Sequence, residues 1–215
     1  SPPPPHTPIL SGLVGSEMCI RDRTKRIQAS ELQGRGVLAN CNVNVVQLQD
    51  FGDYGGYQQE LKYLLTNKKR LDYISKLCTK INESGNTLIL VDRISAGEML
   101  QELIPGSTFV KGDVKLKDRK DTYDEIQDAT NKVIIATYGV AAVGINIPRI
   151  FNLVLIEPGK SFVRVIQSIG RGIRKAEDKE SVAIWDITSY CKFARRHLTQ
   201  EQNLLYPTLI ILMSW

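Results

Sequence analysis

Residues 134–175 read "IIATYGVAAVGINIPRIFNLVLIEPGKSFVRVIQSIGRGIRK", and this stretch decides the fold class. It contains an apolar run at 151–157 and a segment of helical periodicity at 161–174, and a second apolar run follows at 181–187. Both apolar runs have the length of buried strands. A strand, a helix and another strand in this order form a βαβ unit, which places the two strands parallel in one sheet.

The same alternation continues upstream, beginning at Thr24. Further strands are predicted at 42–51, 87–92, 107–112 and 132–137, and further helices over 57–85, 95–104 and 115–130. The pattern therefore predicts an α/β domain over residues 24–200, with five or six strands in a mostly parallel sheet flanked by helices.

The segment 161–174 has polar side chains opposite its apolar stripe. Ser161 is a suitable N-cap, and the helical spacing puts apolar residues on one face and three polar ones nearly opposite: Gln167, Arg171 and Arg174. A solvated face is one interpretation. The second is a phosphate contact, because guanidinium groups donate several hydrogen bonds from a planar fork and stay charged. Gly170 and Gly172 favour it, since a plain surface helix has no use for glycine.

A second glycine-bearing segment, predicted as a loop, follows the strand at 132–137. Open α/β sheets bind ligands at the carboxyl ends of their strands. Four residues there can offer backbone amides or short polar groups to an anion: Thr137, Gly139, Gly144 and Asn146. A turn that needs the φ angles of glycine explains the same residues equally well.

Composition narrows the class of protein. The chain has 215 residues, 42% of them hydrophobic, and a formal charge of +5, which permits an anionic partner. No apolar run is long enough to predict a membrane span. The four cysteines form no C-x-x-C pair, so no metal site is predicted.

The two ends of the chain differ from its middle. Residues 1–23 are proline-rich and aperiodic, resemble translated sequencing-adapter sequence, and are expected to be a non-native disordered segment. Residues 201–215 receive no assignment, and a second non-native end is one interpretation of them.

Together, "IIATYGVAAVGINIP" and "QSIGRGIRK" resemble motifs V and VI of superfamily 2 helicases, in that family's order and spacing. "TLILVDR" resembles the strand motif that precedes them, and the likeness is to phage helicases of the UvsW type in particular. The resemblance implies a three-layer RecA-like fold, the second lobe of two. It assigns Gln167, Arg171 and Arg174 to an ATP site between lobes, with the two arginines as fingers toward the γ-phosphate. It adds Gly144, Asn146 and Gly170 as nucleotide contacts, and Thr137, Gly139 and Arg93 as nucleic-acid contacts.

The sequence contains no G-x-x-x-x-G-K-[ST] loop and no acidic Walker B strand. We therefore expect a fragment, the C-terminal lobe of an ATP-dependent DNA helicase or translocase, that is inactive alone. ATP and Mg²⁺ would be held mainly by an N-terminal lobe in the parent chain. The expected partner is branched or single-stranded DNA, not a membrane, and the expected location is the cytoplasm, of the host if the source is viral.

Two other functions stay open. A free-standing nucleic-acid-binding module without ATPase activity would use the same basic groups, whereas a Rossmann-type enzyme is disfavoured because its G-x-G-x-x-G signature is absent. A basic cluster near the end of the domain fits either a nucleic-acid contact or a solvated helix face: Lys192, Arg195, Arg196 and His197, beside Tyr190 and Phe193.

Overall fold

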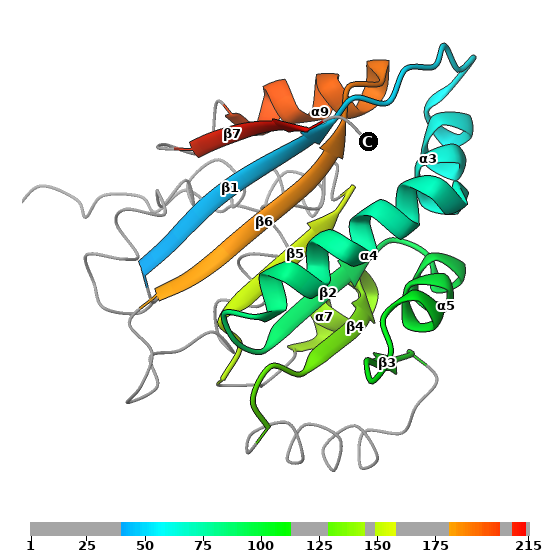
Figure 1. The fold of residues 1–215 in the computed structure, drawn as a ribbon. Helices are drawn as coiled ribbons and strands as arrows, with labels where there is room; N and C mark the ends of the chain where they lie inside the picture. The colour runs from blue at the N-terminus through cyan, green and yellow to red at the C-terminus, as the bar shows by residue number, and fades with distance from the viewer. Residues whose placement is uncertain (1–39, 113–128, 145–148, 158–180, 203–207, 214–215) are drawn as a thin grey trace, which may run out of the picture.

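The computed structural model describes residues 40–112, 129–144, 149–157, 181–202 and 208–213. These residues build a seven-stranded sheet in the order β3-β4-β2-β5-β6-β1-β7 (Figure 1). The strands are β1 (Asn40–Leu48), β2 (Thr87–Val91), β3 (Thr108–Val110), β4 (Val133–Thr137), β5 (Asn152–Ile156), β6 (Ser181–Ser189) and β7 (Thr208–Met213). Every neighbouring pair is parallel.

The central strands are apolar because both of their faces are covered. Every residue of β2, "TLILV", and of β5, "NLVLI", is buried. Parallel strands between two helical layers are expected to lose the in-and-out alternation of a half-exposed strand. The uninterrupted apolar runs in the sequence are therefore the direct mark of a sheet covered on both sides.

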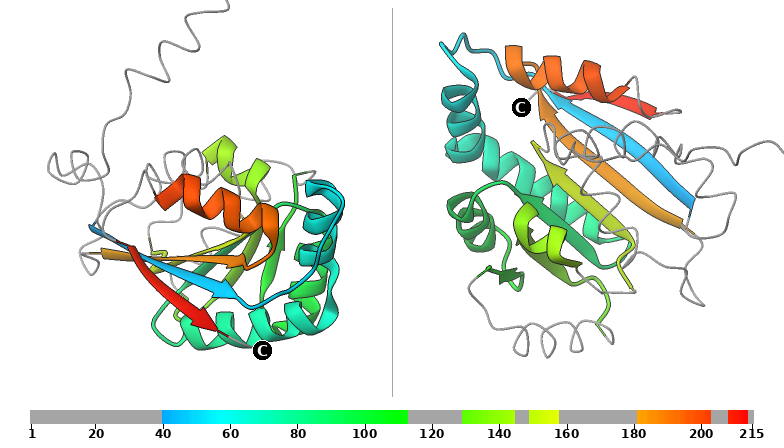
Figure 2. Two further views of the ribbon diagram at one scale, coloured as in Figure 1. Left: turned by 90° about the horizontal axis from the view of Figure 1, so that it is seen from above. Right: turned by 180° about the vertical axis from the view of Figure 1, so that it is seen from behind.

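The helices form two layers, one on each face of the sheet (Figure 2). The helices α3 (Tyr57–Thr66), α4 (Lys68–Asn82) and α5 (Ile94–Leu103) pack their apolar sides on one face, against residues such as Ile89 and Val154. The opposite face carries α7 (Tyr138–Gly144), which packs on Leu88 and Leu153, and α9 (Lys192–Gln202). The three-layer α/β prediction is thus confirmed.

Two local predictions differ from the structure. Residues 138–144 are the helix α7 rather than a loop, because the chain turns directly from β4 into helical geometry. Residues 208–213, which received no assignment, form β7 and pair with β1, so the sheet has seven strands rather than five or six. The predicted helices at 115–130 and 161–174 lie outside the described residues, apart from 129–130.

Candidate functional site at the carboxyl edge

The strand order brings the predicted nucleic-acid residues to adjacent positions. Strands β2 and β4 are hydrogen-bonded neighbours, and Thr137, the last residue of β4, pairs with Val91, the last residue of β2. Arg93 follows β2 by two residues, and Gly139 follows β4 by two. We call this side of the sheet, where the parallel strands end, the carboxyl edge. It is where ligands bind in open α/β sheets.

The chain leaving β4 is held in place by Tyr138, whose hydroxyl donates a hydrogen bond of 3.1 Å to the carbonyl of Ile156 at the end of β5. Thr137 Oγ1 accepts from the Val140 amide at 3.4 Å, so the threonine side chain is turned toward the first turn of α7. Tyr138 is buried, whereas Thr137 is half-buried. The buried Tyr138 therefore holds the chain in place, while the adjacent Thr137 stays partly exposed at the carboxyl edge.

Gly139 is exposed, and the fold gives no reason for glycine there. A Cβ atom would meet nothing closer than Thr137 Oγ1, at 3.9 Å, among the described residues. Its backbone does not adopt the left-handed conformation that favours glycine. The turn interpretation of this residue is therefore wrong, and space for an approaching ligand remains as an explanation.

Arg93 is half-buried at the start of α5. Its Nη2 donates to Gln58 Oε1 at 3.1 Å, and its carbonyl accepts from the Gly97 amide at 3.2 Å as the helix begins. The backbone of Arg93 is thus fixed by the helix. Among the described residues, the side-chain partners of its guanidinium are the neutral Gln58 and the adjacent Asp92, 4.0 Å away. Such a group has hydrogen-bonding capacity left for an anion.

The predicted nucleotide contacts fall largely outside the described residues. This holds for Gln167, Gly170, Arg171, Arg174 and Asn146, whereas Gly144 is the last residue of α7. Guanidinium and amide groups are suitable donors to triphosphate oxygens. Within the described ranges, no group of three or more His, Cys, Asp or Glu residues could hold a metal ion.

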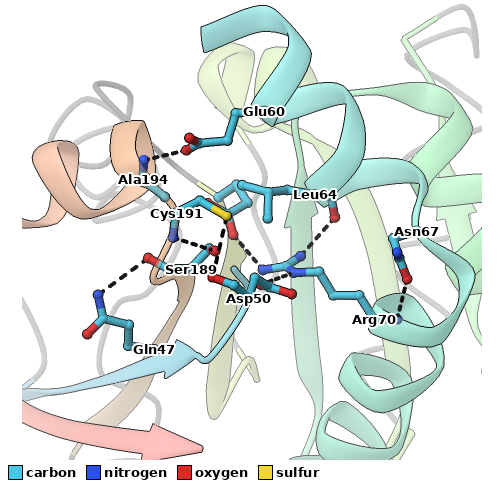
Figure 3. A network of polar contacts seen from close by, with 10 residues as sticks. Gln47, Asp50, Glu60, Leu64, Asn67, Arg70, Ser189, Cys191 and Ala194 are labelled. Atoms are coloured by element: carbon cyan, nitrogen blue, oxygen red, sulfur yellow. Dashed lines mark hydrogen bonds and ion pairs between the residues drawn. The ribbon is translucent and has the colours of Figure 1, made fainter. Parts of the chain in front are cut away.

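Beneath the carboxyl edge lies a buried ionic network centred on Arg70 of α4, drawn with most of its partners in Figure 3. Its Nε donates to Asp50 Oδ2 at 2.8 Å, its Nη1 to the Leu64 carbonyl at 2.8 Å, and its Nη2 to Glu157 Oε1 at 2.5 Å. Asp50 follows β1 and Glu157 follows β5, so one guanidinium connects the ends of two strands to the α3–α4 junction. The network thus holds the segments that follow β1 and β5 against the α3–α4 junction.

Two of the carboxyl groups beneath the edge hold their protons unusually strongly. Burial raises the pKa of Glu157 to about 7, although the Arg70 guanidinium opposes the shift. Burial, with a smaller contribution from the Glu157 charge, raises the pKa of Asp186 to about 8. Both side chains line a cavity of about 10 Å³ under α9, and Asp186 Oδ1 accepts no hydrogen bond from the residues that the structure describes. That volume is at the lower limit for one water molecule.

Sequence reasoning missed this network, although the sequence carries signals for it. Glu157 ends the segment "FNLVLIE", and Asp186 interrupts the apolar strand "SVAIWDI". Arg70 is spaced four residues before Ile74 and eight before Cys78, on the buried stripe of α4. A charged residue on an apolar stripe is the recognisable sign of a buried ion pair.

Within the described residues, no helix has both the length and the apolar character needed to cross a membrane.

The profile of the helicase conserved C-terminal domain matches residues 69–176, half of this 215-residue chain. The chain belongs to this helicase family. The matched span includes α4, β2, β4 and β5, and therefore both strands that carry the carboxyl-edge residues. It also includes Gln167, Arg171 and Arg174.

Two curated viral proteins are similar in sequence. The ATP-dependent DNA helicase uvsW of Enterobacteria phage T4 is 26% identical over 174 residues, which cover 76% of this chain and 35% of that protein. Putative helicase 22 of a Sulfolobus islandicus filamentous virus is 25% identical over 152 residues, covering 66% of this chain and 27% of that protein. The chain thus spans about a third of the length of these relatives.

Solved structures share the fold. The crystal structure of T4 UvsW superimposes with a TM-score of 0.68 at 21% identity, covering 81% of this chain and 42% of that one. The C-terminal domain of the DEAD-box protein Dbp5 gives a TM-score of 0.56 at 17% identity, covering 83% of this chain and 92% of that domain. The three-layer fold is therefore that of the RecA-like C-terminal lobe of helicases.

Proposed function

We propose that this chain is the C-terminal lobe of an ATP-dependent DNA helicase or translocase, a fragment of a longer parent protein. The family match over residues 69–176 carries the proposal. It is supported by the position of Arg93 and Thr137 at the ends of two hydrogen-bonded strands, where an α/β sheet binds its ligands. A lobe of this kind works in a pair, and an N-terminal lobe would complete it.

The nucleotide side of the proposal rests on the segment "QSIGRGIRK". Arg171 and Arg174 would stabilise negative charge on the transferred phosphoryl group, with Gln167 beside them and with Gly144, Asn146 and Gly170 as further nucleotide contacts. ATP supplies the phosphoryl group, and the N-terminal lobe would hold ATP and Mg²⁺ through its phosphate loop and acidic strand.

The nucleic-acid side of the proposal rests on the carboxyl edge. Thr137 and Gly139 would approach the backbone of a DNA strand, because an exposed glycine and a short hydroxyl side chain leave room for it. Arg93 would pair with a phosphate, since its guanidinium has donors left over. Cycles of lobe closure would move single-stranded or branched DNA along this edge. The protein would act in the cytoplasm, or in the host cytoplasm if its source is viral.

The test uses the chain joined to its N-terminal lobe. Arg174→Ala should lower kcat for ATP by about 10³-fold or more, the scale expected for an arginine finger, while DNA affinity changes little. Lys80→Ala is the matched control, because Lys80 is an exposed cation at the far end of α4 that pairs with the exposed Glu83. Steady-state ATPase assays with saturating DNA measure the effect.

Unchanged kcat in a folded Arg174→Ala protein would contradict the finger role. The 215-residue chain alone should show no turnover above a catalytically dead control. If the chain binds DNA but no N-terminal lobe ever restores ATPase activity, the free-standing nucleic-acid-binding module becomes the better function.

A further inference from the structure

An exposed aromatic pair lies at the carboxyl ends of β1 and β6, away from the residues that the family motifs assign. Phe51 is 74% exposed and Tyr190 is 40% exposed, and their ring centroids are 5.9 Å apart. The guanidinium carbon of Arg195 lies 5.2 Å from the centre of the Tyr190 ring. Large aromatic side chains are costly to leave in water, so a gathered and exposed pair indicates a binding surface.

A second group of rings lies where α9 meets the start of α3, and α9 also carries Arg195, the cation beside Tyr190. Phe193 lies 6.2 Å from Tyr57, with Lys192 placed over its ring at 5.7 Å, and Tyr57 contacts His197 at 5.1 Å. The residue after Tyr57, Gln58, is the hydrogen-bond partner of Arg93. We call this set the aromatic edge: Phe51, Tyr57, Tyr190, Lys192, Phe193, Arg195 and His197.

The backbone under the aromatic edge is fixed by buried contacts. The Tyr190 amide donates to the Leu48 carbonyl at 2.9 Å, which joins the ends of β6 and β1. The buried Glu60 carboxylate accepts from the Phe193 and Ala194 amides at 3.0 and 2.7 Å, which holds the start of α9 against α3, as Figure 3 shows for Ala194. Beside Phe51, a Cβ at Gly52 would lie 2.5 Å from the Tyr54 ring, so a larger residue there would displace that ring.

The charge of the aromatic edge favours an anionic partner. Three exposed cations, Lys192, Arg195 and Arg196, lie on the first turns of α9, and Arg93 is linked to the start of α3 through Gln58. Asp53 and Asp92 are the exposed carboxylates on the adjoining described segments 49–56 and 92–93. Rings interleaved with cations are the arrangement that binds single-stranded nucleic acid, because bases stack on rings while phosphates pair with the cations.

We propose that the aromatic edge is a base-stacking site for single-stranded nucleic acid, with Phe51 and Tyr190 receiving bases and Arg195 and Lys192 receiving phosphates. The site deepens the proposed function, since it extends the strand track from β4 and β2 across the sheet to β6 and β1. Arg93 would be the junction of the two parts, because it is linked through Gln58 to the start of α3. Stacking tolerates any base, so the site would add affinity without sequence preference.

The test measures binding of the 215-residue chain to fluorescent oligo-dT and oligo-U at low salt. Phe51→Ala should weaken binding about 5- to 100-fold, the range expected from the loss of one stacked base. Phe51→Leu should weaken it comparably, since it keeps the apolar surface but has no ring, and Phe51→Trp should retain it, with tryptophan fluorescence quenched by the oligonucleotide. Leu103→Ala, at the exposed end of α5, is the matched apolar control and should bind like the unaltered chain.

The outcomes separate this inference from the proposed function. If the unaltered chain binds neither oligonucleotide, the stacking site is overturned, whereas the proposed function is still decided by the ATPase assay of the chain joined to its N-terminal lobe. If it binds but Phe51→Leu binds equally well, only the stacking site is overturned. Phe51→Ala could instead keep full oligonucleotide affinity and lose association with the N-terminal lobe. That result would show that a protein surface covers these rings, and it would also overturn the stacking site. Photo-crosslinking of 5-iodouracil oligonucleotides to Phe51 or Tyr190 would support the stacking site directly. Comparison of the affinities for oligo-dT and oligo-U shows which nucleic acid is preferred.

Discussion

At the amino edge of the sheet, where the strands begin, Asn86 and Asn152 connect neighbouring segments through neutral amides, whereas at the carboxyl edge the Arg70 network does so through charges. Asn152, at the start of β5, donates from Nδ2 toward Ser84 Oγ at 3.0 Å and the carbonyls of Ile81 and Gly85 at 3.2 Å. Asn86 joins the start of β2 to Lys132 and Ala129 before β4. Arg70 makes the corresponding connections at the carboxyl edge, but to two carboxylates.

The difference indicates at which edge the stability of the fold depends on pH and on charged partners. Amide contacts do not change with pH, and none of them needs a compensating charge. Buried ion pairs depend on every member, because removing one partner leaves the others charged in a poor solvent for charge. The carboxyl edge thus combines the exposed candidate site with the part of the core that responds most to proton binding.

The largest expected effect is at Arg70. Arg70→Met should lower the free energy of unfolding by about 3–5 kcal/mol, because Asp50 and Glu157 would stay buried without their partner. Urea unfolding measures this loss. Lys76→Met is the control on the same helix, since its ion pair with Asp72 is exposed and worth at most about 0.5 kcal/mol. Equal losses in the two variants would mean that the buried network is not what distinguishes the carboxyl edge.

The amino edge should give a smaller and pH-independent effect. Asn152→Ala removes the hydrogen bonds to Ile81, Ser84 and Gly85 and should cost about 2–3 kcal/mol, since buried acceptors lose their donor. Measured from pH 5 to pH 8, the loss should stay constant. Gln101→Ala is the control, because Gln101 is an exposed amide side chain on the helix α5. A loss from Asn152→Ala that grows with pH would contradict the comparison between the two edges.

The sequence predicted the layers of the fold better than the details of the site. Continuous apolar runs such as "TLILV" alternate with amphipathic helical segments, and this alternation is why the parallel sheet was predictable. The strand at 208–213 was not predictable, because an apolar run of six residues shows no periodicity that identifies a strand. Its strand conformation is defined by its pairing with β1.

At the site, residues adjacent to a strand end were predictable, and contacts across the sheet were not. Thr137 and Arg93 follow β4 and β2 directly, so their common edge follows from parallel pairing alone. Phe51 and Tyr190 are 139 positions apart and meet only because β1 and β6 are neighbours in the strand order. The Arg70 contacts likewise span up to 87 positions, and no local pattern gives their partners.

The smallest expected effect concerns Asp186, and its sign follows from proton binding. The pKa of an aspartate in an unfolded chain is about 4, whereas burial raises the pKa of Asp186 in the folded chain to about 8. Between these values the folded state holds more protons, so stability falls as pH rises and levels off above pH 8. From pH 6 to pH 8 the contribution of Asp186 should be a loss of about 2 kcal/mol.

Asp186→Asn should remove that part of the slope and leave the smaller part due to Glu157, which ends near its own pKa of about 7. Denaturant unfolding at pH 6, 7 and 8 measures both chains. Equal slopes for Asp186→Asn and the unaltered chain would show that Asp186 does not contribute to the pH dependence of stability.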